Sequence, residues 1–224
     1  DPSYNFDSET RWIYYGSQGL PRHFLDGVTD MHDELFDADW WQPASYSEFN
    51  YAETPAFMDI VVNASIVGTD VSATVTVTPL QNNPASTLKL HIVVTEDHYS
   101  ATPGFNGETD FYFVMRKMLP GPMGTCIGPL TQYTPVVVTE NYNFTVGGVT
   151  AGSFNLWSTS NIRVVAFVQD DLTKAVLQSE VSSMLIGLED NKDEVETIIY
   201  PNPAKDFVNV DFDQDLSKVQ IKIT

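Results

Sequence analysis

The chain has 224 residues and a formal net charge of −19, from 30 acidic against 11 basic residues. We expect no nucleic-acid partner, because phosphate binding needs a basic face, and anionic membrane surfaces are disfavoured for the same reason. Hydrophobic residues make up 42% of the chain, enough for one or two domains with packed cores. Cys126 is the only cysteine, which excludes an intrachain disulfide and a Cys-x-x-Cys pair within this sequence. No apolar run reaches the ~18–20 residues of a transmembrane helix.

The first part of the chain mixes helix and strand signals. Ser8 can cap a short helix that Gly16 stops, because serine favours the N-cap and glycine the position after the last turn. A strand follows and ends at an Asp-Gly pair, a strong signal for a tight turn. A second helix is expected to begin at Asp30 and to end before Pro43.

This order, with Gly19-Leu20-Pro21 between the first helix and the strand, resembles the second half of a thioredoxin-like domain. The resemblance implies a partial α/β thioredoxin-like segment over residues 1–55, with Pro21 as a structural cis-proline. The half of that fold with a Cys-x-x-Cys pair would then lie upstream of Asp1. The alternative is that Pro21 only makes a tight turn.

Residues 56–180 have the pattern of an all-β domain. The clearest period-2 alternation runs over residues 71–78, where Val and Ala alternate with Ser and Thr. Other strands are expected at residues 58–66, 88–94, 111–118, 136–138, 142–146 and 162–168, with 174–177 returning across a hairpin turn at Asp170-Asp171. About seven short strands with frequent turns predict a mainly β fold, an antiparallel β-sandwich.

Three stretches of this region resemble the Omp28-related outer membrane protein family of Bacteroidetes: Leu90–His98, Val114–Pro120 and Val164–Asp170. The resemblance implies a surface or secreted protein, and a thioredoxin-like part before the β-domain suits that family. The matching stretches are strands and loops without catalytic residues. We therefore transfer no active site from the family.

The charged residues of 181–197 predict an acidic linker. Residues 198–224 then open with a strand triplet and the run Tyr200-Pro201-Asn202-Pro203-Ala204, whose prolines exclude a sheet interior. This run resembles the start of the C-terminal sorting domain of type IX secretion cargo. This resemblance implies that the protein crosses the periplasm and is recognised by the type IX secretion machinery. It would then be secreted or displayed outside the outer membrane. We expect the chain to be a fragment at both ends.

Candidate ligands for a metal ion are few in type and scattered. His91 and His98 flank an acidic pair, but strand spacing separates them, and we interpret both as solvated side chains. Oxygen ligands for Ca²⁺, the one ion that we consider, are Glu96, Asp97, Asp110, Asp170 and Asp171. No EF-hand spacing is present, so no metal ligand is assigned and no cofactor is expected.

Trp40, Trp41 and Trp157 could form a surface that binds sugar or peptide, since aromatic side chains provide rigid contact area. The alternative is that they fill the junction between the two parts of the chain. No nucleophile elbow, phosphate loop or zinc-protease helix is present, so no catalytic residue is assigned.

The sequence thus favours a non-enzymatic module for binding or adhesion, secreted or at the cell surface, with an unknown extracellular ligand or surface protein as partner. Two alternatives stay open. One is a thioredoxin-like oxidoreductase whose catalytic half lies upstream, and the other is an accessory domain of a secreted hydrolase.

Overall fold

The computed structural model describes residues 4–17, 24–30, 56–100, 107, 109–182, 197–200 and 209–212. The chain divides into two compact units, Asp1–Leu188 and Glu189–Thr224. Each unit is described by itself below. In the described residues, no helix has the length and apolar character needed to cross a membrane.

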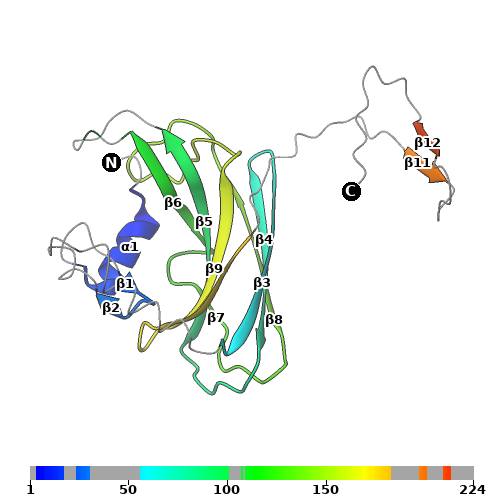
Figure 1. Ribbon diagram of the computed structural model, residues 1–224. Helices are drawn as coiled ribbons and strands as arrows, with labels where there is room; N and C mark the ends of the chain where they lie inside the picture. The colour runs from blue at the N-terminus through cyan, green and yellow to red at the C-terminus, as the bar shows by residue number, and fades with distance from the viewer. Residues whose placement is uncertain are drawn as a thin grey trace, which may run out of the picture. The chain divides into compact units, whose positions relative to one another are not determined.

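The first unit is built on two antiparallel sheets that face each other (Figure 1). One sheet has the order β10-β9-β5-β6, with the short β7 also paired to β5, and the other has the order β3-β4-β8. The strands of the larger sheet are β5 (Leu88–Ser100), β6 (Asp110–Leu119), β7 (Thr125–Cys126), β9 (Ile162–Asp170) and β10 (Val176–Val181). Those of the smaller sheet are β3 (Met58–Val67), β4 (Asp70–Pro79) and β8 (Val136–Asn143). The predicted mainly β, sandwich-like fold is confirmed.

The core lies between the sheets and follows the predicted alternation. In β4, every second residue from Val71 to Val77 is fully buried, while the threonines and serine between them are half-buried. Within the larger sheet, Leu90 of β5 lies beside Val168 of β9, and both side chains are fully buried. Alternation places one set of side chains of each strand on the inner face, which explains why these β-branched residues form these strands.

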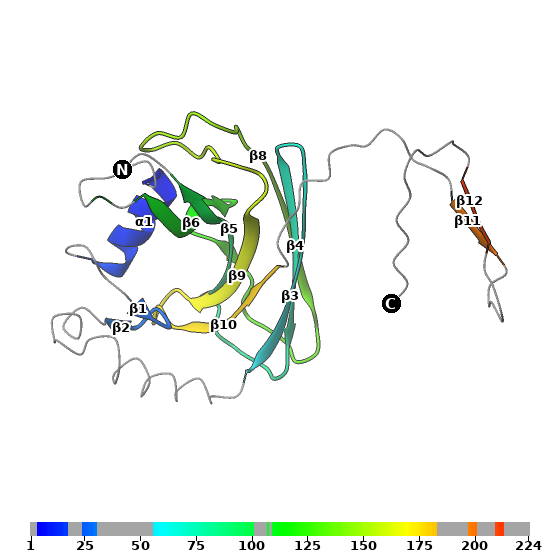
Figure 2. The ribbon, with the colours of Figure 1, turned by 45° about the horizontal axis from the view of Figure 1, so that its top comes forward.

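β5 differs from a strand with one solvent-exposed face, because every residue from Leu90 to Asp97 is buried, on both faces of the strand. It also continues as a strand to Ser100, six residues beyond the end of the strand expected at residues 88–94. The outer face of its sheet is covered by α1 (Phe6–Tyr15), which lies on the side away from β3 and β4 in both views (Figure 2).

The boundaries of α1 follow from its capping residues. Asn5 is the N-cap, and it forms a reciprocal capping box with Ser8: the Asn5 side chain accepts from the Ser8 N–H, and Ser8 Oγ accepts from the Asn5 N–H. The prediction of Ser8 as the cap was wrong, since Ser8 occupies the third helical position of a box that Asn5 opens. Gly16 ends the helix in the left-handed conformation, as predicted.

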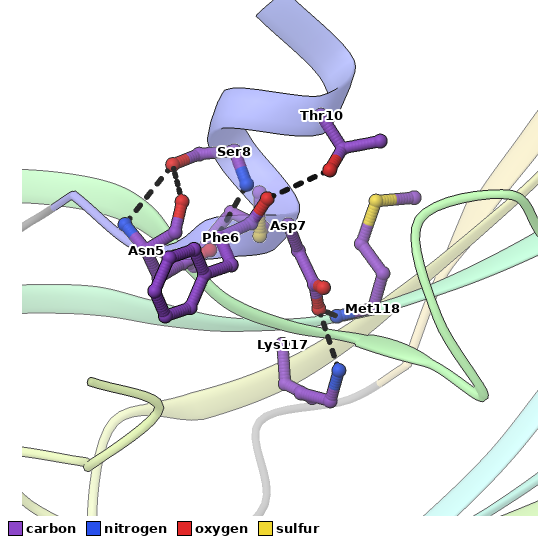
Figure 3. A network of polar contacts seen from close by, with 8 residues as sticks. Asn5, Phe6, Asp7, Ser8, Thr10, Lys117 and Met118 are labelled. Carbon is purple, nitrogen blue, oxygen red and sulfur yellow. Dashed lines mark hydrogen bonds and ion pairs between the residues drawn. The ribbon is translucent and has the colours of Figure 1, made fainter. Parts of the chain in front are cut away.

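Asp7 fastens α1 to the sheet through the carboxylate network of Figure 3. One oxygen of this buried carboxylate accepts hydrogen bonds from Lys117 Nζ at 2.7 Å and from the Met118 N–H at 2.8 Å. Asn5 Nδ2 donates to the Met115 carbonyl at 2.9 Å, also on β6. At the other end of the helix, Arg11 donates to Gln169 Oε1 of β9 at 2.6 Å. These bonds span more than a hundred residues of sequence.

A short hairpin follows α1, formed by β1 (Phe24–Leu25) and β2 (Thr29–Asp30). It is held against β10, because the Asp26 carbonyl accepts from the Val176 N–H at 2.8 Å. Asp30 therefore lies in a strand and does not begin a helix. The remainder of the predicted second helix lies outside the described residues.

In the second unit, β11 (Thr197–Tyr200) pairs with β12 (Asn209–Phe212) in an antiparallel hairpin. Ile199 lies opposite Val210 in this register. In sequence, the Pro-Asn-Pro-Ala run falls between the two strands. This position is expected for proline, which has no N–H group to donate to a strand ladder.

Replacing Asp7 by alanine should lower the free energy of unfolding by about 3–5 kcal/mol, because it leaves the Lys117 ammonium buried without its carboxylate. Urea unfolding of the full chain measures this loss. Asp59→Ala, at an exposed carboxylate of β3, is the matched control and should change stability by less than about 0.5 kcal/mol. Equal, small losses in both variants would contradict the anchoring role of Asp7.

Candidate functional site

The end of the β5–β6 ladder brings the candidate residues of β5 next to a run of aromatic residues on β6. His98 lies directly opposite Tyr112, Tyr99 opposite Phe111, and Ser100 opposite Asp110. β6 is the last strand of its sheet, so one of its sides has no neighbouring strand within the described part of the chain. Aromatic side chains on such an edge are accessible to a partner.

Tyr112 and Phe113 are the most exposed aromatic side chains of this end, with 61% and 70% of their surface accessible. Phe113 also has a positive φ of 52°, a conformation that bulky side chains rarely adopt. The positive φ costs folding free energy, and the exposed rings bury little apolar surface to offset it. We call His98, Asp110, Tyr112 and Phe113 the edge aromatic surface.

The polar part of this surface is centred on the Asp110 carboxylate. Its Oδ1 atom accepts from Ser100 Oγ at 2.8 Å and contacts His98 Nε2 at 3.0 Å, and its Oδ2 atom accepts from Thr109 Oγ1 at 2.9 Å. These hydrogen bonds, that of Ser100 first, lower the pKa of Asp110 below its ordinary value. The His98 ring lies against Tyr112, with 4.7 Å between ring centroids.

A buried assembly supports the surface from beneath. Tyr99 stacks between Phe111 and Trp157, with ring centroids 5.1 Å and 5.3 Å away. The Arg116 guanidinium lies 4.6 Å from the centre of the Tyr99 ring and forms an ion pair with Glu96. Both partners of that ion pair are almost completely buried, which holds this end of the sheet rigidly.

The five predicted oxygen ligands do not gather around one point. Glu96 is used by Arg116 and by the Ser158 N–H, which donates to Glu96 Oε1 at 2.8 Å. Asp97 forms an ion pair with Arg163, while Asp110 belongs to the edge aromatic surface. Within the described residues, no group of three or more His, Cys, Asp or Glu side chains could hold a metal ion.

Asp170 and Asp171 lie at the β9–β10 turn, as the hairpin interpretation predicts. Asp170 Oδ1 accepts from Thr87 Oγ1 at 2.6 Å and from the Leu172 N–H at 3.0 Å. Asp171 forms an ion pair with Lys89 at 2.9 Å. The pKa of each carboxyl is lowered, mainly by the hydrogen bonds from Thr87 and from Lys89 respectively.

Of the three predicted ligand-binding tryptophans, only Trp157 lies in the described part of the chain. It is half-buried and stacked on Tyr99, so it supports the surface more than it forms it. Trp40 and Trp41 lie outside the described residues, as do Pro21 and the sorting residues Pro201, Asn202, Pro203 and Ala204. Tyr200 ends β11.

The prediction that His91 is solvated was wrong. Its side chain is buried and stacks on Phe167 of β9, with 4.8 Å between ring centroids. On another side, a Cβ at Gly124 would lie 2.8 Å from the imidazole, so glycine makes room for the ring. Phe167 of β9, the turn at Gly124 and Arg11 of α1 lie around the ring, on the outer face that alternation assigned to solvent. Burial, followed by the nearby Arg11 and Lys89 charges, lowers the pKa of His91 to about 3.

The sequence interpretation missed Tyr112, Phe113 and Arg116, because the apolar stretch 111–118 was interpreted only as a strand. A usable signal was present: three consecutive aromatic residues cannot all face one core, since successive side chains of a strand point to opposite faces. The conformation of Phe113 has no comparable signal in the sequence.

Residues 198–224 match the family described as Secretion system C-terminal sorting domain. The predicted sorting segment is thereby confirmed, and the protein is secreted or displayed at the cell surface. No curated protein matches the chain.

Two solved structures from Porphyromonas gingivalis are similar to the chain. A domain of the outer membrane lipoprotein Omp28 is 20% identical over 60% of this chain and 92% of its own, with a TM-score of 0.40. HBP35 is 11% identical over 78% of this chain, with a TM-score of 0.50. The chain covers 55% of HBP35, and this likeness shows a shared fold alone.

His91→Phe should weaken the acid sensitivity of folding. The unfolded histidine takes up a proton near pH 6.5, whereas the folded one does so only near pH 3, so acid favours the unfolded wild-type chain in between. Relative to wild type, the variant should gain up to about 1.4 kcal/mol of stability per pH unit as the pH falls from 6 to 4.

Urea unfolding at several pH values measures this slope. The phenylalanine keeps a ring against Phe167, and any misfit beside Gly124 adds an offset that does not depend on pH. Parallel stability curves for the two proteins would contradict a neutral buried His91.

Proposed function

We propose that the protein is a non-enzymatic binding module, exported by the type IX secretion system, that holds an extracellular ligand at the edge aromatic surface. The sorting segment supports the compartment, and the exposed aromatic residues of β6 support the binding role. The acidic character of the whole chain keeps such a module soluble outside the cell.

The exposed aromatic residues Tyr112 and Phe113 near the Asp110 carboxylate are the observation on which the binding role rests. A large aromatic side chain that is 70% exposed and has a positive φ has no advantage for folding. Exposed aromatic residues are enriched where proteins bind partners, because they offer large contact area at a low cost in conformational entropy. The Arg116–Glu96 ion pair and the Tyr99 stack beneath keep this surface in one arrangement before a ligand arrives.

Export depends on the second unit in this proposal. The type IX machinery recognises the segment from Tyr200 onward, the segment is removed, and the first unit is released or anchored outside the outer membrane. Separation of the two units along the chain is compatible with such removal, because the sandwich core lies wholly within the first unit.

Binding can be tested on an array that displays both immobilised glycans and extracellular-matrix proteins. Labelled wild-type protein should be retained on at least one class of spot. The Tyr112→Ala/Phe113→Ala double variant should bind at least about tenfold more weakly, because it removes the central aromatic contacts.

Tyr133→Ala is the matched control for the array. Tyr133 is 69% exposed and also has a positive φ, of 56°, but it lies in the loop before β8, away from the β5–β6 end. Its variant should bind as wild type does. Binding of the double variant at wild-type strength, or no retention of wild type on any spot, would refute the proposal.

Removal of residues from Tyr200 to the end of the protein should stop export. The truncated protein should accumulate in the periplasm of a type IX-competent cell, while the intact protein reaches the outside. Cell fractionation and protease accessibility on intact cells measure the difference. Undiminished surface display after the truncation would show that another segment directs export.

A further inference from the structure

We propose that the ligand of the edge aromatic surface is a neutral carbohydrate chain. This inference rests on the proposed function and concerns the chemical class of its ligand. Two parts of the surface support it: exposed rings, and a fixed carboxylate beside them. The residues around the surface also disfavour the two main alternatives, a peptide strand and an anionic polymer.

The rings match the apolar faces of sugars. A pyranose ring presents C–H groups on its faces and hydroxyls around its rim, so it packs on a flat aromatic side chain. Tyr112 is 61% exposed, and its tilted contact with His98 fixes the ring position without covering it. Phe113, the next residue, is also exposed, but successive side chains of a strand point to opposite faces. Tyr112, held beside His98, therefore provides the ring on which a sugar would pack.

The carboxylate matches the hydroxyl rim. An ionised carboxylate has about four acceptor positions, and three at Asp110 are used by Ser100, Thr109 and His98. Among the described residues, no donor uses the remaining position on Oδ2, and the Asp110 side chain is half exposed. It can accept a hydrogen bond from a sugar hydroxyl. Because Ser100 and Thr109 donate their own protons to Asp110, their oxygen atoms also remain acceptors for further hydroxyls.

A peptide strand is disfavoured because the edge of β6 is irregular. Strand addition requires a continuous row of outward backbone groups. The β5–β6 register shifts between Val94 and Thr95, and the left-handed conformation at Phe113 interrupts the extended backbone of β6 further along. Bulges and twisted edges of this type are devices that prevent strand addition.

An anionic polymer is disfavoured by charge. The chain has a net charge of −19, and Asp110 places a negative charge within the surface itself. A uronate or sulfated sugar would be repelled at close range. The acceptors offered by the surface are instead suited to the hydroxyls of a neutral glycan.

Affinity electrophoresis of the full chain in native gels tests the proposal with three neutral polysaccharides, laminarin, yeast mannan and dextran, and with the anionic polymer alginate. Wild type should be retarded by at least one neutral polysaccharide and not by alginate. Tyr112→Ala and Asp110→Asn should each weaken the retardation, the first by about tenfold in Kd, while Tyr133→Ala keeps it.

Circular dichroism of each variant establishes that a loss of binding is not a loss of fold. Retardation by none of the neutral polysaccharides, or retardation that survives both substitutions, would overturn the carbohydrate inference. Retention on protein spots of the array that depends on Tyr112 and Phe113, without any response to glycans, would overturn it while leaving the binding function in place. No response on either class of spot would overturn both.

Discussion

The buried Asp7 carboxylate is the contact on which the arrangement of the first unit most depends. By binding Lys117 Nζ and the Met118 N–H, it holds α1 on the outer face of the larger sheet. A β-sandwich with two wet outer faces would leave β5 half solvated, whereas here β5 is buried on both faces. Both side chains of the ion pair are largely buried. Removing one partner would therefore destabilise the fold by far more than the intact pair stabilises it, because the other charge would stay buried without a partner.

The two ends of the larger sheet illustrate different uses of buried polar side chains. Near α1, the neutral His91 is enclosed beside Phe167, and the arrangement serves packing alone. At the β5–β6 end, the Arg116–Glu96 ion pair lies against the Tyr99 ring of an aromatic stack, and Phe113 of the same strand has a positive φ that folding does not favour. Rigid support under a strained, exposed side chain is the arrangement expected where a surface is organised for binding before the ligand is present.

Sequence reasoning was accurate wherever one strand or one motif contained the whole signal. The alternation of residues 71–78 predicted β4, and the apolar run 162–168 predicted β9 together with its return hairpin. It failed at His91 and at Ser8, where the outcome depended on a neighbour. For His91 that neighbour is a helix about eighty residues earlier in the chain, and for Ser8 it is the side chain of Asn5, which competes for the same capping position.

The sequence by itself determined the compartment and the fold class, because a sorting motif and a two-residue periodicity are local properties that a few neighbouring residues express. The tertiary structure alone decided that both faces of β5 are buried, which carboxylates form ion pairs or hydrogen bonds, and where aromatic side chains reach the surface. Those outcomes depend on contacts between residues as far apart as Asp7 and Lys117, or Glu96 and Ser158. The free energy of burial is set by what covers a side chain, and the covering element is specified elsewhere in the chain.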